Sequence, residues 1–201
     1  IRDVYEFKGH VTILDIGGTS TYWDLVDDSF LRDFNVKITL LNLPGKESFQ
    51  DSRHIVHHFG DATEALWETY KQSEFDLIHS NSVIEHVGDW EKMKKFALNI
   101  TSFRGGYFVQ TPNFWFPIEP HCLTLFFHWL PKPLKIFWVQ KMALGHWPKA
   151  SDVSEAVNIV DSARLLDKHQ FKFLFKDAEL IREKILIFTK SFIAVKRKKD
   201  F

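Results

Sequence analysis

The sequence predicts a protein of the α/β class, with a mainly parallel sheet covered by helices. The first observation is an apolar run at residues 12–16 that ends at Gly17 and Gly18 and is followed by helical spacing over residues 20–33. This order is typical of a buried strand, a tight turn and a helix. The second observation is that further short apolar runs alternate with helical segments up to residue 110. Parallel strands joined by right-handed crossovers produce such an alternation.

The later elements follow from apolar runs and turn signals. Strands are expected at residues 36–41, 54–59, 75–80 and 107–110. Helices are expected at residues 63–71, with Asp61 or Thr63 as cap, and at residues 82–99, with a break at Gly88 and Asp89. Each strand therefore ends close to a polar or small residue.

The last third of the chain has a different order. Residues 160–169 have helical spacing, with Asp161 as cap, and strands are expected near residues 171–175 and 185–195. No helix is expected between these two strands, so they should pair as an antiparallel hairpin.

An unusual segment, residues 112–150, separates the parallel strands from this last third. It holds six of the seven prolines, nine aromatic residues and a single acid, Glu119. Residues 123–130 and 134–144 could each form a short helix. The segment is either a small helical cap packed on the sheet or a lid that holds a substrate, because loops at the carboxyl ends of parallel strands commonly bind ligands. The two interpretations are compatible.

Composition limits the class of protein. A chain of 201 residues with 45% hydrophobic and 26% charged residues suits one domain, here 1–201 with 112–150 as an insertion. The 26 basic and 26 acidic residues balance, which argues against a nucleic-acid partner. Cys122 is the only cysteine, so neither an internal disulfide nor a multi-cysteine metal site can form.

Cellular location is indicated only by what the sequence lacks. No apolar run reaches the roughly 18 residues of a membrane span, and no leading segment has the pattern of a signal peptide. We therefore expect a cytoplasmic protein without stable membrane insertion. The first residue is Ile1 and not Met, so the sequence leaves open that the chain is a fragment of a longer protein.

Two motifs resemble those of one enzyme family. Asp15, Gly17 and Gly18 resemble motif I of the class I S-adenosylmethionine-dependent methyltransferases, Asp/Glu-x-Gly-x-Gly, although Thr19 stands at the third small position. Residues 75–87 are similar to the fourth strand and following turn of the small-molecule and glycan branch, of the methyltransferase type 11-like kind. Neither a dinucleotide fingerprint nor a phosphate-loop string occurs in the chain.

The resemblance implies a fold and a cofactor. The fold would be a Rossmann-like, doubly wound sheet of seven strands, mainly parallel with the last strand antiparallel, in the order 3-2-1-4-5-7-6. The cofactor would be S-adenosyl-L-methionine, and the enzyme would be of bacterial type. The implied cofactor-binding residues are Asp15, Gly17, Gly18, Thr19, Asn42, Leu43, Asp61, Ala62, Asn81 and Ser82.

Two of these positions also have simpler interpretations. Asn42 stands where the family has an acid that binds the ribose, and an amide keeps one acceptor oxygen but lacks the charge. It could instead only begin the turn at Pro44 and Gly45. Asp61 stands where the family binds adenine, but it could serve only as a helix cap.

Candidate catalytic residues come from the chemistry of methyl transfer. An in-line displacement from a sulfonium mostly needs alignment, and a hydroxyl acceptor must also lose its proton. His121 and His86 are the candidate bases, with Glu119 to orient His121; each could instead have a purely structural partner. We expect no metal site, since Glu119 and His121 lack further obvious ligands in the sequence, and the strand neighbours His57 and His58 should point to opposite faces.

The sequence therefore predicts a methyltransferase that modifies a small-molecule or glycan acceptor, at a hydroxyl oxygen. The departures at Thr19 and Asn42 leave a second hypothesis, a binding or regulatory module with weak or no activity. A nicotinamide oxidoreductase is disfavoured, because the third glycine and a Tyr-x-x-x-Lys pair are missing. A peripheral-membrane role for the aromatic segment and a homodimer both remain open.

Overall fold

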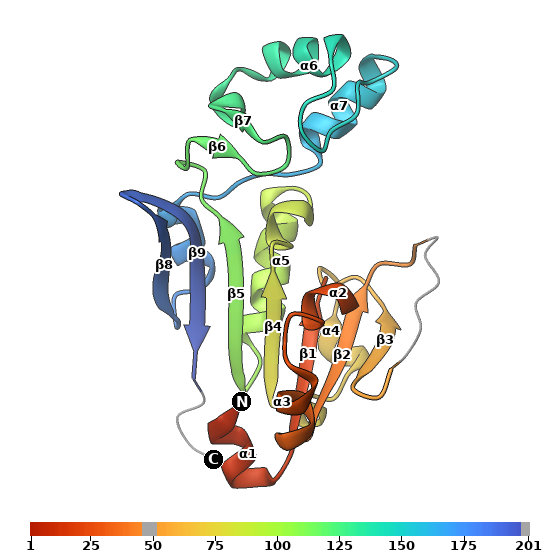
Figure 1. Ribbon diagram of the computed structural model, residues 1–201, viewed down its shortest axis with the longest axis vertical. Helices are drawn as coiled ribbons and strands as arrows, with labels where there is room; N and C mark the ends of the chain where they lie inside the picture. Colours follow the sequence, from red (N-terminus) through yellow and green to blue (C-terminus); the bar gives the residue numbers. More distant parts are fainter. Residues whose placement is uncertain (46–51, 198–201) are drawn as a thin grey trace.

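Seven strands form a single sheet in the order β3-β2-β1-β4-β5-β9-β8 (Figure 1). The protein is described by a computed structural model, which covers residues 1–45 and 52–197. The strands are β1 (Val11–Ile16), β2 (Val36–Asn42), β3 (Ile55–Phe59), β4 (Leu77–Asn81), β5 (Gly106–Pro112), β8 (Glu179–Ile185) and β9 (Phe188–Lys196). The first five are parallel, and β9 pairs antiparallel with both β5 and β8. The predicted fold class and strand order are confirmed.

The helices cover both faces of this sheet. They are α1 (Arg2–Lys8), α2 (Ser20–Trp23), α3 (Asp28–Asp33), α4 (Leu66–Thr69), α5 (Trp90–Thr101) and α8 (Lys168–Leu174), with short 3-10 turns η1 (Gln72–Glu74) and η2 (Ile84–His86). The side chains of β1 contribute to two hydrophobic clusters, one on each face of the sheet, because successive strand residues point to opposite faces. Ile13 packs with α1, α2 and α3, whereas Leu14 packs with α5 and α8.

Residues beyond β5 build a separate small unit above the carboxyl ends of β4 and β5, at the top of Figure 1. It contains β6 (Ile118–Glu119), β7 (Thr124–Leu125), η3 (Phe127–Trp129), α6 (Lys132–Lys141) and α7 (Val153–Asp161). Six buried residues form its own core: Cys122, Phe127, Val139, Ala150, Ala156 and Val160. The chain enters and leaves this unit side by side, since Asn113 pairs with Leu166 and the Phe114 amide donates to the Leu166 carbonyl over 3.0 Å. We call residues 113–166 the insertion.

The two helices predicted inside the insertion have different outcomes. The helix at 134–144 is present as α6. The helix at 123–130 is wrong, because this stretch holds β7 and η3. Leu123 and Phe126 have φ of 49° and 59°, in the left-handed region that an α-helix cannot include.

The predicted strand at 171–175 is also wrong. This stretch lies in and directly after α8, which begins at the capping box formed by Asp167 and Gln170. Phe171, Leu174 and Phe175 are buried, at the i, i+3, i+4 spacing of one helix face. The predicted helix at 160–169 is also wrong over most of its length, because α7 ends at Asp161 and α8 begins only at Lys168. Asp161 is therefore the last residue of a helix and not a cap at the start of one. The antiparallel hairpin exists, but its first strand is β8.

The earlier helices are shorter than predicted. The expected helix at 20–33 is divided into α2 and α3, and the Thr19 side chain caps α2. The helix at 63–71 is reduced to the single turn of α4. The predicted break at Gly88 and Asp89 is confirmed, and Asp89 caps α5.

A fully buried carboxylate lies under the turn that follows β1. Asp15 is 0% exposed and accepts hydrogen bonds from Trp23 Nε1 to Oδ2 (2.7 Å) and from His79 Nδ1 to Oδ1 (2.8 Å). With its proton on Nδ1, His79 presents Nε2 to the Tyr22 hydroxyl, 3.3 Å away. Asp15 therefore joins β1, β4 and α2 at one point.

Replacing Asp15 by alanine should cost roughly 3 kcal/mol or more of unfolding free energy, because two buried donors would lose their acceptor. Urea denaturation measures this loss. Asp33→Ala, an exposed acid in α3, should change stability by less than about 0.5 kcal/mol. Equal effects of the two substitutions would contradict the bracing role of Asp15.

Replacing Asp167 by alanine should destabilise the protein by about 1 kcal/mol, because the capping box at the start of α8 would be lost. The measurement is the urea midpoint, compared with that of Lys168→Ala, an exposed neighbour whose side chain does not cap the helix. A smaller loss for Asp167→Ala than for Lys168→Ala would argue against the cap.

Candidate functional site

One cavity gathers most of the residues predicted to bind the cofactor. It has a volume of about 790 Å³ and lies at the carboxyl ends of β1, β2 and β3, where parallel α/β sheets usually bind ligands. Seven of the predicted residues line it: Gly17, Gly18, Thr19, Asn42, Leu43, Asp61 and Ala62. His86 of η2 also lines it, together with the flanking Val83 and with Lys92 and Phe96 of α5. The sequence-based prediction did not include Lys92 or Val83.

The glycine turn is shaped by close contacts on both sides. Gly17 has φ of +73°, and a Cβ atom there would lie 2.5 Å from Val83 Cγ2. A Cβ atom on Gly18 would overlap the Asp15 carboxylate. Both positions therefore require glycine, since any side chain would meet strain or a collision. The backbone of the turn is thus exposed to the cavity without side chains in front of it.

A hydrogen bond of the Asn42 side chain accounts for an amide at this position, where the methyltransferase pattern has an acid. Its Nδ2 donates a hydrogen bond to the Gly18 carbonyl over 3.0 Å, which ties the end of β2 to the glycine turn. An aspartate could not donate this bond. Among the described residues, no hydrogen bond to the amide oxygen of Asn42 is present, so this oxygen can serve as an acceptor at the cavity wall.

One carboxylate oxygen of Asp61 accepts two hydrogen bonds from Thr63. Its Oδ1 accepts from the amide of Thr63 (2.8 Å) and from the Thr63 hydroxyl (2.7 Å). The bonds fix the carboxylate at the cavity edge. Thr19 is also partly committed, since its hydroxyl accepts from the Tyr22 amide as the cap of α2.

Three predicted cofactor residues do not line this cavity. Asp15 lies beneath the turn, with both carboxylate oxygens engaged by Trp23 and His79, so it shapes the turn from below. Asn81 and Ser82 line a neighbouring cavity of about 540 Å³ between β4, β5, β9 and the insertion. Ser82 adopts φ of 57°, and its hydroxyl donates to Gln110 Oε1 over 2.9 Å.

The three candidate catalytic residues are connected in one chain of contacts. Glu119 Oε1 accepts from His121 Nδ1 at 2.7 Å, and Glu119 Oε2 accepts from the amides of His121 and Cys122, each at 2.7 Å. His121 Nε2 lies 3.0 Å from His86 Nε2. His86 Nδ1 in turn donates to the Ser162 carbonyl at 2.8 Å. Trp147 stacks on the His121 ring, with centroids 6.4 Å apart.

A fourth residue, Glu85, belongs to this group. It is 1% exposed, its Oε2 accepts from the Thr111 hydroxyl over 2.9 Å, and its Oε1 has no hydrogen-bond partner among the described residues. Ligand atoms of Glu85, His86 and His121 all lie within 4.8 Å of one another. The sequence alone did not assign Glu85 to this group, because His121 and Thr111 lie 26 or more residues away from it. The available signal was its position next to His86 after β4.

The surroundings shift the pKa of three residues in this group, Glu119, His121 and Glu85. Burial favours a higher pKa for Glu119, but the hydrogen bonds from His121 and Cys122 outweigh burial and hold it below its usual range. Burial favours a lower pKa for His121, and the neighbouring Glu119 carboxylate raises it above the ordinary value. At Glu85 burial dominates and raises the pKa.

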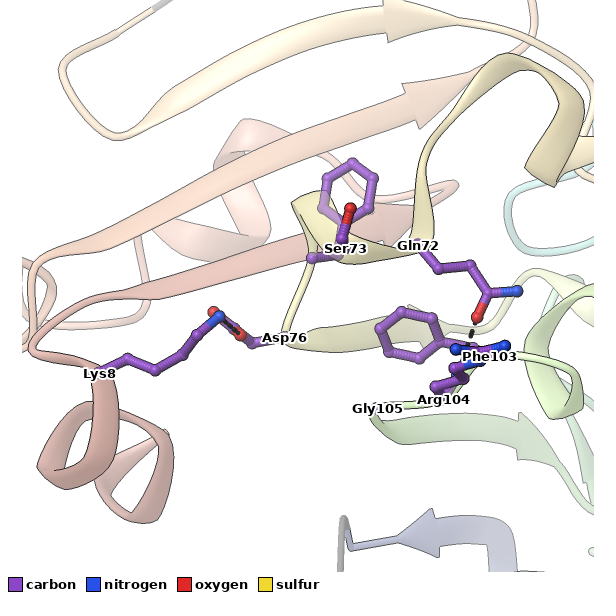
Figure 2. A pocket seen from close by; sticks show the side chains of 8 residues that line it. Lys8, Gln72, Ser73, Asp76, Phe103, Arg104 and Gly105 are labelled. Carbon is purple, nitrogen blue, oxygen red and sulfur yellow. Dashed lines mark hydrogen bonds and ion pairs between the residues drawn. The ribbon is translucent and has the colours of Figure 1, made fainter. Parts of the chain in front are cut away.

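A second large cavity, of about 580 Å³, lies at the opposite, amino end of the strands (Figure 2). Figure 2 shows Lys8 and Asp76 meeting across it, and Gln72 joined to Arg104. Asp76 also accepts from the amide and hydroxyl of Thr12. Burial opposes ionisation, but Lys8 and Thr12 keep the pKa of Asp76 below its usual range. These charges satisfy one another, so this cavity is a structural joint between α1 and β4.

The insertion exposes a large aromatic surface. Trp115, Phe126, Trp129, Phe137 and Trp138 are all at least 40% exposed. Within residues 1–45 and 52–197, no helix combines the length and apolarity that crossing a bilayer requires.

Comparisons with known proteins identify the fold. No protein-family model matches the sequence, and no characterised protein matches it by sequence. Among solved structures, an O-methyltransferase family protein from Burkholderia thailandensis aligns over 94% of this chain and 52% of its own, with a TM-score of 0.54 and 14% identity. Human N-acetylserotonin methyltransferase, in complex with S-adenosylmethionine, aligns over 92% and 47%, with a TM-score of 0.52 and 14% identity.

The chain thus spans about half the length of these methyltransferase chains. A protein described as a Zn-dependent alcohol dehydrogenase from Rhodobacter sphaeroides also aligns, over 92% of this chain and 83% of its own, with a TM-score of 0.56 and 10% identity. It shares the general doubly wound architecture. O-, C- and other S-adenosylmethionine-related methyltransferase structures recur among the neighbours. The sheet order and these neighbours together show that the chain has the Rossmann-like fold of the class I S-adenosylmethionine-dependent methyltransferases.

Proposed function

We propose that this protein binds S-adenosylmethionine in the 790 Å³ cavity and transfers its methyl group to a hydroxyl of a small-molecule or glycan acceptor. The observation that carries the proposal is the convergence of the glycine turn, Asn42 and Asp61 on one cavity at the carboxyl edge of the sheet. The glycine turn offers backbone groups at close range, and Asn42 and Asp61 offer polar side chains for the ribose and the adenine. The volume lies within the usual range for small-molecule sites.

The acceptor hydroxyl would be activated at the group formed by Glu119, His121 and His86. His86 lines the proposed cofactor cavity and contacts His121 from the insertion. In the reaction, the bond between sulfur and the methyl carbon breaks while the bond between the acceptor oxygen and that carbon forms. The acceptor gives up its proton, and the donor leaves as a neutral thioether. The protein contributes alignment of the two reactants and removal of the proton.

The neighbouring 540 Å³ cavity is our proposed acceptor site. Its lining combines polar groups, such as Asn81, Gln110 and Asn113, with the apolar rings of Phe108 and Phe116. A sugar or a phenol presents hydroxyls and an apolar face together, and this lining can contact both. The exposed aromatic surface of the insertion extends the apolar character beyond the cavity.

Asp61→Asn should weaken S-adenosylmethionine binding by about tenfold, because a charged acceptor becomes a neutral one while the bonds to Thr63 are retained. Isothermal titration calorimetry with the methyl donor and with its demethylated product measures this effect. Asp27→Asn, at the cap of α3 and outside the cavity lining, should bind as the parent does. Absence of saturable donor binding by the parent protein would overturn the proposed function.

His121→Ala should lower kcat by about 10²- to 10⁴-fold, because activation of the acceptor hydroxyl would be lost, with little change in donor affinity. The measurement is release of the demethylated donor in the presence of a panel of sugars, nucleotide-sugars and phenols. His169→Ala changes an exposed histidine of α8 and should leave turnover unchanged. Full activity of His121→Ala would remove this residue from the reaction.

Saturable donor binding without turnover on any acceptor would favour the binding or regulatory module instead. Two features support that alternative. The Thr19 hydroxyl caps α2, and the Asn42 amide group donates to the Gly18 carbonyl, so both side chains already make structural hydrogen bonds. A cytoplasmic location, a bacterial-type enzyme and a homodimer stay predictions from the sequence.

A further inference from the structure

We propose that Glu85, His86 and His121 form a binding site for a divalent transition-metal cation of the Zn²⁺ type. The inference deepens the proposed function, because the cation would be the agent that activates the acceptor hydroxyl. Binding of the cation itself does not depend on the methyl donor. It departs from the sequence-based expectation of no metal site, which considered Glu119 and not Glu85 as a partner of His121.

The Nε2 atoms of His86 and His121 face each other without an evident hydrogen-bond donor between them. His86 Nδ1 faces the Ser162 carbonyl and His121 Nδ1 faces the Glu119 carboxylate, so both Nδ1 atoms carry the proton. In neutral rings, the two Nε2 atoms are then both acceptors, and they face each other at 3.0 Å. This contact is satisfied either when one of the two atoms carries an added proton or when both bind a cation that lies between or beside them. Two nitrogens bound to one tetrahedral Zn²⁺ are roughly 3.3 Å apart, close to the separation seen here.

Glu85 supplies the negative charge and a free ligand atom. Its Oε1 is buried without a hydrogen-bond partner among the described residues, which is costly for a carboxylate. The hydroxyl of Thr111 fixes the other oxygen. The three ligand atoms lie within 4.8 Å of one another, so a small side-chain movement would bring all of them onto one ion. His86 is exposed, which gives the ion a route from solvent.

The surroundings of the imidazoles are those of metal-ligating histidines. In metal sites, the ring nitrogen that does not bind the metal commonly donates to a carboxylate or a backbone carbonyl. His121 has the first arrangement through Glu119, and His86 has the second through Ser162. These contacts also hold both rings in the orientation that the site needs.

The donor set selects the class of ion. Two imidazoles and one carboxylate suit Zn²⁺, Co²⁺ or Fe²⁺, whereas Mg²⁺ and Ca²⁺ prefer sites made of oxygen alone. Three protein ligands leave a tetrahedral ion with one open position. An acceptor hydroxyl at that position would lose its proton to solvent more readily, and its oxygen would lie beside the cavity proposed for the methyl donor.

The test uses Co²⁺ as a spectroscopic probe and Zn²⁺ as its competitor, on the chain alone without methyl donor or acceptor. We expect one Co²⁺ per chain, with visible absorption stronger than that of the hydrated ion and displaced by Zn²⁺. His86→Ala and His121→Ala should each weaken binding at least tenfold, and Glu119→Gln should weaken it about 10- to 100-fold. His169→Ala is the matched control and should bind as the parent does. Circular dichroism checks that each variant is folded.

Absence of a Co²⁺ spectrum in the parent protein, or unchanged binding in both His86→Ala and His121→Ala, would overturn the site. The two proposals fail separately. Co²⁺ binding without S-adenosylmethionine binding would leave the metal site in place and remove the proposed enzyme function. Full turnover by protein freed of metal with a chelator would show that the imidazoles activate the acceptor without a cation, and would overturn the role given to the ion.

Discussion

The buried Asp15 carboxylate is the constraint on which the edge of the sheet beside the proposed cofactor cavity depends. It takes hydrogen bonds from Trp23 of α2 and His79 of β4 while its own backbone lies in β1. The same carboxylate occupies the space in which a side chain on Gly18 would lie. The sharp turn after β1, the position of the short helix that follows it, and the backbone of the turn at the cavity wall therefore all depend on one buried carboxyl group.

The chemistry of the site depends on a second junction, between the sheet and the insertion. His86 follows β4, His121 lies between β6 and β7, and the Ser162 carbonyl follows α7. Each of these three groups comes from a different part of the chain, so the imidazole pair exists only when the insertion sits on the sheet. A further tie runs from the Arg164 amide to the Glu85 carbonyl over 2.7 Å. This backbone bond fixes the chain that leaves α7 directly to η2.

The five parallel strands were predictable because each is an apolar run that ends near a glycine or a polar residue. The edge strand β8 was not, because its sequence is mostly charged and largely exposed. The segment at 171–175 was not predictable in this way, since its aromatic residues fit either a strand or a helix, and the Asp167–Gln170 capping box decides between them. In the site, glycines and strand-end residues were found because they share one edge. The structural roles of Asp15 and Glu85 were not evident from the sequence, because both depend on burial and on partners distant in the chain, His79 for Asp15 and Thr111 for Glu85.

The paired entry and exit of the insertion at Asn113 and Leu166 have a consequence for how the molecule can change. The insertion is joined to the rest of the protein by two adjacent chain segments. Asn113, on the first of them, is anchored to β9 by hydrogen bonds to the carbonyls of Lys190 and Thr189. The insertion has its own core, whereas the residues that line the proposed donor cavity all come from the part of the chain before it. Replacing the insertion by another unit at this junction would therefore change the surface above the sheet and remove Glu119 and His121, while the cavity proposed for the methyl donor would keep its lining.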